Sequence, residues 1–105
     1  MKNDRRAFDN NCELSAATLL SAARALKLLG HPVRLKIVTG LLRQPSCVKD
    51  IWECLGMPQA VISQHLAKLK SNGLIESKKV GVEHHYTVVN PMVKIIAEYL
   101  TGLRA

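Results

Sequence analysis

The chain contains 105 residues, enough for one domain and too few for a second. Apolar residues make up 48% of the sequence, so a hydrophobic core is expected. Fifteen Lys and Arg residues against eight Asp and Glu residues leave a net charge of +7, which favours a polyanionic partner, nucleic acid first and an anionic membrane second. This composition excludes a multidomain enzyme, a membrane span and a disulfide-knotted secreted domain.

The N-terminal region and the cysteines indicate the compartment. Asp4, Asp9 and Glu13 interrupt the region in which a secretory signal needs a basic start and an apolar run, so no signal is expected. Three cysteines, an odd number, favour free thiols in a reducing environment over a disulfide scaffold. We therefore expect a cytoplasmic protein with no membrane partner.

The first predicted elements are a flexible arm and a long helix. Residues 1–12 carry charges and asparagines with few apolar side chains, which is typical of a loose N-terminal arm. Residues 13–105 are predicted to form one domain, which begins with an Ala- and Leu-rich helix over residues 13–29 that ends at Gly30. One apolar stripe of this helix contains Leu14, Thr18, Ala22, Leu26 and Leu29. Together with the stripe of the last helix it exceeds what so small a core can cover, so both helices are expected to form a homodimer interface.

Three shorter helices are predicted next. The first covers about residues 33–42 and carries Arg34 on its polar side. Two more, over about residues 47–55 and 58–71, are separated by a turn that contains Gly56, which is the spacing of a helix-turn-helix. The second of these has a buried stripe made of Val61, Ile62, Leu66 and Leu69.

The pattern then changes to β structure before a last helix. Residues 74–80 and 83–89 are β-leaning runs on either side of Gly81-Val82, which predicts a hairpin. Asn90-Pro91 begins a helix whose stripe contains Val93, Ile96, Ala97 and Leu100. The predicted order is helix, helix, helix, helix, hairpin, helix, a mainly α fold with one β-hairpin.

Three motifs in the chain point to a known family. The segment LLGHPVRLKI at 28–37 is similar to a Gly-Asp-Pro-x-Arg-Leu-x-Ile signature, and ISQHLAKL at 62–69 is similar to a recognition-helix core. The segment NGLI at 72–75, followed by Lys78, Lys79, Gly81 and Tyr86, is similar to a wing. Together, over about residues 14–103, they resemble the ArsR/SmtB-type winged helix-turn-helix repressors. The resemblance implies a winged-helix DNA-binding and dimerisation domain over residues 13–105, and a homodimeric, sequence-specific transcriptional repressor that binds double-stranded operator DNA.

A recognition helix presents the residues of its N-terminal half to base edges. Gln59, Ser63 and Gln64 fall opposite the buried stripe and are the candidate base contacts. His65 and Lys68 lie where a phosphate would meet them, and His65 is equally suited to bracing the helix. The hairpin is expected to follow the flanking minor groove or backbone with Lys78, Lys79, His84 and His85.

Four residues depart from the family's pattern. Pro58 replaces a Ser or Thr helix cap, and Ala60 replaces a hydroxyl residue or Pro. Val82 stands at the wing tip where Arg is frequent, and His31 stands where Asp usually precedes the proline.

The resemblance also implies that a metal, metalloid or oxidant releases the DNA. The family's zinc-type site uses His residues on the last helix, and residues 91–103 contain none. The other type of site uses thiols. Cys47-Val48-Lys49-Asp50 is similar to the family's Cys-Val-Cys-Asp motif, with Lys49 in place of the second cysteine.

Cys47 is therefore the candidate sensor thiol, with Cys12 as its partner. Lys49 and the helix N-terminus are expected to lower the pKa of Cys47 and make it reactive. Cys54 lies two helical turns away, about 10 Å, so Cys47 and Cys54 cannot bind one ion, and Cys54 is expected to pack at the edge of the core. Arsenite, cadmium or a similar thiophilic ion and reversible thiol oxidation both stay open as signals.

Other classes of function have less support. An enzyme would need a nucleophile with a base, such as Cys47 with His65, and the sequence supplies no third orienting group or phosphate-binding loop. A basic protein-interaction or membrane-surface module is disfavoured because the cations do not line one amphipathic face. A DNA-binding regulator without any metal or thiol sensor is the closer alternative.

Overall fold

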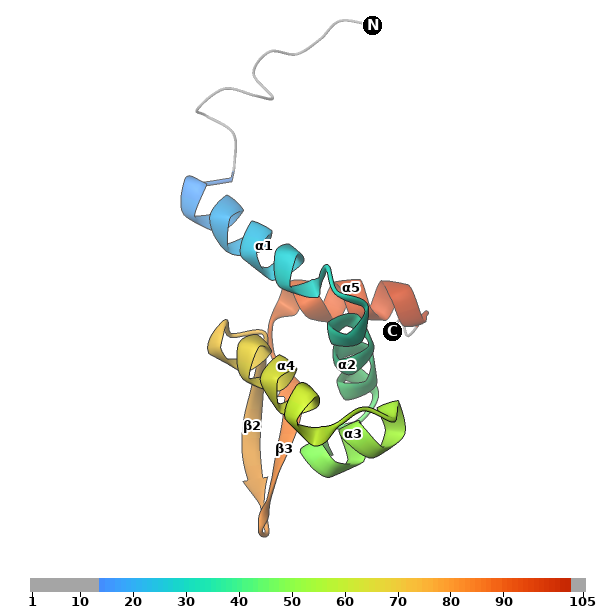
Figure 1. Cartoon of the computed structure of the whole chain (residues 1–105). Coiled ribbons are helices and arrows are strands. Elements are labelled where there is room, and N and C mark those ends of the chain that lie inside the picture. Colours follow the sequence, from blue (N-terminus) through green and yellow to red (C-terminus); the bar gives the residue numbers. More distant parts are fainter. Residues whose placement is uncertain (1–13, 103–105) are drawn as a thin grey trace, which may run out of the picture.

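Five helices and a three-stranded antiparallel sheet form residues 14–102, the part of the chain that the computed structural model describes (Figure 1). In chain order they are α1 (Ala16–Leu29), α2 (Pro32–Arg43), β1 (Ser46–Cys47), α3 (Val48–Leu55), α4 (Gln59–Ser71), β2 (Ile75–Val80), β3 (Glu83–Val88) and α5 (Pro91–Thr101). The predicted order of helices and hairpin is confirmed. The predicted arm, residues 1–12, lies outside the described residues, and with it Cys12.

Side-chain caps explain where three of the helices begin. The hydroxyl of Ser15 accepts from the backbone N–H of Thr18 at 3.1 Å, so α1 begins at Ala16 rather than at residue 13. His31 caps α2, because its Nδ1 accepts from the N–H of Val33 at 3.2 Å. The Oδ1 of Asn90 accepts from Met92 and Val93 at 2.9 and 3.2 Å, which caps α5.

The hairpin projects beyond the helices as a wing (Figure 1). Gly81 adopts a φ of 65°, which allows the tight turn between β2 and β3. The register pairs Lys79 with His84 and Lys78 with His85. Since opposite residues of an antiparallel pair share a face of the sheet, Lys79 and His84 lie on one face and Lys78 and His85 on the other.

The short strand β1 was not predicted from the sequence. Ser46 pairs with Tyr86 and Cys47 pairs with His85, so β1 forms the edge of the sheet beside β3. The expectation that Cys47 begins the helix is therefore corrected by one residue, because Cys47 closes β1 and caps α3. A strand of two residues is too short to display an alternating pattern.

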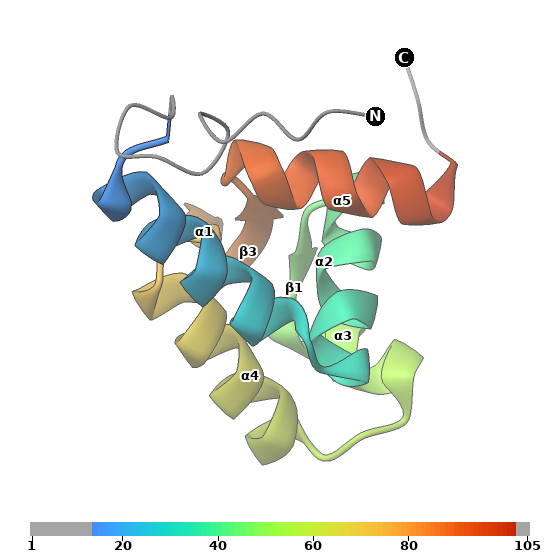
Figure 2. The same ribbon diagram turned by 90° about the horizontal axis from the view of Figure 1, so that it is seen from above.

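The core lies between α4, α2, the base of the hairpin and α5. Its fully buried side chains are Val38, Ile62, Leu66, Leu69, Leu74, Ile75 and Val93. Viewed from above, α5 and α4 lie on opposite sides of the molecule, with α1 between them and α2 beside α1 (Figure 2). The predicted stripe of α4 is confirmed, with Ile62, Leu66 and Leu69 at its centre and Val61 half-buried.

The core covers only part of the predicted stripe of the first helix, as expected for a stripe too large for the core. Within this chain α1 buries Ala25, Leu28 and Leu29, whereas Leu26 is 52% exposed. Leu14 and Thr18 are exposed as well, and the N-terminal part of α1 extends away from the body (Figure 1). An Ala- and Leu-rich helix offers little polar contrast, so its sequence does not fix which side is buried.

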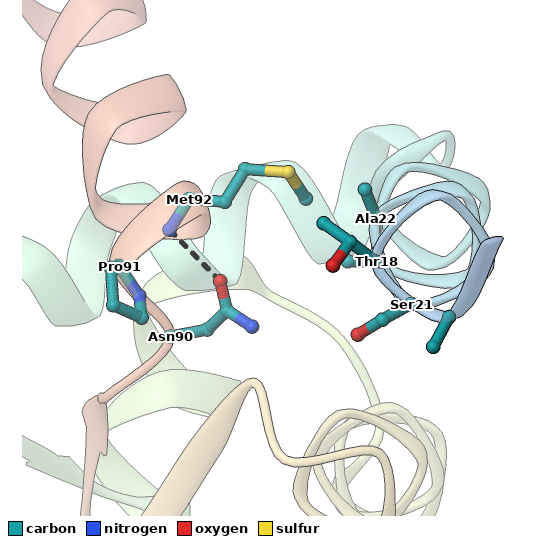
Figure 3. A pocket seen from close by; sticks show the side chains of 8 residues that line it. Thr18, Ser21, Ala22, Asn90, Pro91 and Met92 are labelled. Carbon is teal, nitrogen blue, oxygen red and sulfur yellow. Dashed lines mark hydrogen bonds between the residues drawn. The ribbon is translucent and has the colours of Figure 1, made fainter. Parts of the chain in front are cut away.

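Between α1 and the beginning of α5 there is an open cavity of about 490 Å³ (Figure 3). Thr18, Ser21 and Ala22 line it on the α1 side, and Met92 extends toward α1 from the other side. The same two helices expose large apolar side chains, namely Leu19, Leu20 and Leu26 on α1 and Ile95, Tyr99 and Leu100 on α5. Within residues 14–102, no helix combines the length and apolar character required to cross a membrane.

Candidate nucleic-acid interface

The buried triad of α4 determines which of its residues face outward. Ile62, Leu66 and Leu69 have essentially no exposed surface, so the helix cannot rotate about its axis without leaving the core. At about 100° per residue, Ser63 and Gln64 then lie on the outer side. Gln59, Ser63 and Gln64 are all exposed, as the sequence predicts for base-contacting residues.

The outer surface of α4 continues onto the wing through a contact that the sequence did not predict. Lys70 donates from Nζ to the hydroxyl of Ser77 on β2 at 2.9 Å. Ser77 shares a face of β2 with Lys79, two residues further along the strand. This contact connects the end of α4 to the wing face that carries Lys79 and its partner across the strands, His84.

The opposite face of the wing has a different charge pattern. Lys78 lies across from His85, and His85 Nε2 lies 3.8 Å from a carboxylate oxygen of Glu83. Lys78, Lys79 and His84 are all exposed, as is Lys68 on α4. Each of these side chains is therefore accessible to a polyanion. The face shared by Lys79 and His84 lies on the same side of the sheet as α4, because Ser77, which contacts Lys70 of α4, is on that face.

His65 lies on the inner edge of α4 and contacts α2. Its Nδ1 accepts a hydrogen bond from Nε of Arg34 at 3.2 Å, and its ring meets the ring of His31 edge to face, with centroids 4.7 Å apart. Burial lowers the pKa of His65, and the positive charges of His31, Arg34 and Lys68 lower it further. These contacts are those of a residue that braces the helix, the second of the two roles expected from the sequence.

Arg34 is more deeply placed than the sequence indicates. The prediction put it on the polar side of α2, but it is half-buried, and its Nη1 also donates to the backbone carbonyl of Leu28 at 3.2 Å. Arg34 therefore links the end of α1 to α2 and α4. The only sign of this linking role in the sequence is that Arg34 stands at the Arg position of the signature-like segment LLGHPVRLKI.

The two described cysteines reverse their expected environments. Cys47 is buried, with 4% of its surface exposed, while Cys54 is exposed rather than packed at the core edge. The backbone N–H of Asp50 lowers the pKa of Cys47, but burial and the carboxylates of Glu83 and Asp50 outweigh it, so the pKa is raised. The expected reactive thiolate is therefore not formed at neutral pH.

The described residues do not fit a bound thiophilic ion. Among residues 14–102, no three or more His, Cys, Asp or Glu side chains are grouped so that they could hold a metal. Cys47 and Cys54 differ in burial, and Cys12, the predicted partner, lies outside this range. A site for arsenite or cadmium is thus not formed by the described side chains.

Comparisons with known proteins agree with this geometry. The profile described as "Bacterial regulatory protein, arsR family" matches residues 31–77, from the cap of α2 into the wing. The transcriptional repressor PagR of Bacillus anthracis is 35% identical over 83 residues, covering 78% of this chain and 83% of PagR. The crystal structure of PagR superposes with a TM-score of 0.77 at 34% identity, over 82% of this chain and 99% of PagR.

Two other solved structures share the fold. HlyU from Vibrio cholerae, described as a transcriptional activator, superposes with a TM-score of 0.78 at 30% identity, over 85% of this chain and 97% of HlyU. The homodimeric winged helix-turn-helix domain of Mb0332 from Mycobacterium bovis gives 0.75 at 27% identity, over 91% and 89% of the two chains. The predicted winged helix-turn-helix fold is confirmed.

The burial of the cysteines leads to a test by thiol labelling. In a Cys12→Ser background, Cys54 should react with a small alkylating reagent at least about tenfold faster than Cys47 at neutral pH, because Cys47 is buried and protonated. Mass spectrometry of peptides after short exposure measures both rates. Denaturant should remove the difference, and faster labelling of Cys47 in the folded protein would contradict the structure.

Proposed function

This chain belongs to the arsR family of bacterial regulatory proteins, and we propose that it is a homodimer that binds specific DNA sequences and represses transcription. The observation that carries the proposal is the orientation of α4. Its inner side is buried in the core, its outer side presents Gln59, Ser63 and Gln64, and the wing adds the exposed lysines Lys78 and Lys79. As a DNA-binding regulator it would act in the cytoplasm.

The outer residues of α4 have the chemistry for reading bases. A glutamine amide both donates and accepts, so Gln59 or Gln64 can form paired hydrogen bonds with adenine in the major groove. The hydroxyl of Ser63 can donate or accept and therefore suits several bases. None of the three carries a charge, so their contribution depends on the base sequence more than on the phosphates.

The cations supply affinity that does not depend on sequence. Lys68 follows the reading residues on α4, and Lys78, Lys79 and His84 lie along the wing. Contacts between such side chains and phosphates release counterions, so binding should weaken steeply with salt. The net charge of +7 agrees with this role.

The exposed apolar surfaces of α1 and α5 support a dimer. Leu20 and Leu26 on α1 and Ile95 on α5 are each more than half exposed, although the core of the single chain is complete. A chain of this size gains further burial by pairing with a second copy. The relative Mb0332 is described as homodimeric. A twofold dimer would place one α4 on each of two half-sites.

Repression is the proposed direction of control because PagR, the relative with the longer match, is described as a repressor. HlyU is described as an activator. Repression and activation would use the same DNA-binding surface and would differ in where the operator lies relative to the promoter. A reporter assay with the operator placed upstream of or across the transcription start site therefore tests which of the two applies.

A thiol-reactive signal at Cys47, with Cys12 as its partner, is the second part of the proposal. Cys47 immediately precedes α3 and pairs with His85 of the wing strand β3. An adduct on its thiol would disturb the helix that precedes α4 and the edge of the sheet at once. Because the thiol is buried, this response would require local opening of β1 and would be slow.

Substitutions on α4 and on the wing should weaken DNA binding in two different ways. Gln64→Ala or Ser63→Ala should cost about 1–3 kcal/mol on the best duplex selected from a random library and little on random duplex. Lys78→Ala or Lys79→Ala should weaken both duplexes alike and reduce the salt slope by about one unit each. Fluorescence anisotropy at several salt concentrations measures both. Equal losses on both duplexes for Gln64→Ala would reject α4 as the reading helix.

A charge placed in the apolar surface of α1 should separate the subunits. Leu26→Glu would bury two carboxylates in the twofold interface, raising the dimer Kd by about 100-fold or more. Sedimentation velocity at micromolar concentration should then show monomer, and specific DNA binding should fall with it. Val80→Glu is the matched control for the sedimentation measurement alone, since Val80 is also 52% exposed but lies on the wing, and this variant should stay dimeric. A Leu26→Glu protein that stays dimeric contradicts this interface.

The thiol signal predicts a specific phenotype for Cys47→Ser. The variant should bind the selected duplex as the wild type does and should no longer release it when treated with peroxide or persulfide. Cys54→Ser should keep the response, since Cys54 is exposed and is not part of the β1–β3 pairing. If Cys47→Ser still releases the duplex as the wild type does, the signal acts at another residue. If the wild type itself does not release the duplex, the regulator has no thiol sensor.

A further inference from the structure

A cluster of three side chains joins the inner edge of α4 to α2 and to the end of α1. Arg34 donates through Nε to Nδ1 of His65 and through Nη1 to the carbonyl of Leu28, both at 3.2 Å. The ring of His31 meets that of His65 with centroids 4.7 Å apart and planes at 62°. His31 itself caps α2 through its own Nδ1. All three side chains of the cluster, His31, Arg34 and His65, are half-buried.

The hydrogen bond from Arg34 requires one protonation state of His65. The guanidinium of Arg34 has only donors and stays charged at every relevant pH, so Nδ1 of His65 must offer a lone pair. His65 is then neutral, with its proton on Nε2. A second proton would have to bind Nδ1, which would end the hydrogen bond and leave an imidazolium facing a guanidinium.

The groups around His65 all oppose that second proton. His31 precedes α2, Arg34 lies on α2 and Lys68 lies one turn along α4, and each lowers the pKa of His65 in addition to the larger effect of burial. The neutral form therefore persists as pH falls toward the ordinary imidazole pKa of about 6.5. Since the folded state binds this proton less readily than the unfolded chain does, protonation of His65 works against the observed packing of α4 on α2.

We propose that His65 is a positioning residue whose charge makes specific DNA binding sensitive to acid. The buried triad sets the direction of α4, and neutral His65, which accepts from Arg34, adds a link from α4 to α2 that restrains the segment carrying Ser63 and Gln64. Protonated His65 loses the hydrogen bond from Arg34, so this link is removed while the triad stays buried. The inference rests on the proposed function, because it assumes that α4 reads DNA. The affinity for specific DNA should be constant above about pH 7 and should fall as the pH decreases below about 6.5, the ordinary imidazole pKa.

This behaviour is opposite to that of a histidine that contacts phosphate. An imidazolium next to a phosphate would gain affinity in acid and increase the salt slope. The chain contains four histidines, so the wild-type pH profile alone does not isolate one of them. A pair of substitutions at position 65 isolates the contribution of His65.

The test compares the wild type with His65→Asn and His65→Gln. The Oδ1 of Asn can occupy the position of Nδ1 and accept from Arg34 without titrating, whereas the oxygen of Gln lies one bond further out. The probe is the best duplex selected from a random library at about pH 7.5, with random duplex as the control, and the Kd is measured down to about pH 5.5 at constant ionic strength.

At about pH 7.5, His65→Asn should bind the selected duplex within about threefold of wild type, and His65→Gln should bind about tenfold more weakly, the loss of one hydrogen bond to a charged group. In acid, the wild type should lose specific affinity relative to His65→Asn. Equal pH profiles for wild type and His65→Asn, or a wild type that gains affinity relative to it, would overturn the inference. Failure to select any duplex would instead reject the proposed function.

A measurement without DNA tests the same geometry. Nitrogen-15 NMR of the free protein should find His65 in the Nε2–H form and should find it protonated only below the ordinary imidazole pKa of about 6.5. His31→Asp keeps a side-chain cap for α2 and adds a carboxylate beside His65, so it should raise the pH at which His65 is protonated. A His65 that is protonated at or above this ordinary value and does not respond to His31→Asp would overturn the inference.

Discussion

The burial of Ile62, Leu66 and Leu69 in one side of α4 is the constraint on which the rest of the interface depends. Each side chain removes enough apolar surface from water to contribute about 1.5–3 kcal/mol, and none of the three is measurably exposed. Turning the helix by one residue would expose part of this surface and bury a polar side chain such as Ser63 or Gln64 without a partner. The outward direction of those residues is therefore a consequence of the core.

Two side-chain contacts hold α4 relative to its neighbours. Lys70 reaches Ser77 and joins the end of the helix to the wing, while Arg34 reaches His65 and joins its inner edge to α2. The reading residues and the wing cations are thereby presented as one surface. Arg34 also bonds to the end of α1, the helix whose exposed leucines support pairing with a second chain. The guanidinium of Arg34 therefore connects the helix of the proposed dimer interface to α4.

The features that sequence reasoning recovered are those with strong local patterns. The apolar spacing in residues 61–69 predicted the buried side of α4, and Gly81 between two β-leaning runs predicted the hairpin. Contacts between distant residues could not be predicted in this way. The strand β1 depends on pairing with β3 across about forty residues, and it is this pairing that buries Cys47 beside Glu83. Lys49, which suggested a reactive thiol, is exposed.

The account is tested most directly by locating the DNA on the protein. Isotope-labelled protein titrated with its best selected duplex should change the amide resonances of α4 and the wing, with the largest changes around Ser63, Gln64 and Lys79. The resonances of the exposed surfaces of α1 and α5 should change little, since the proposed dimer would already cover them. Changes concentrated on α1 and α5, with α4 and the wing unaffected, would contradict the claim that the buried triad of α4 sets the DNA-reading surface.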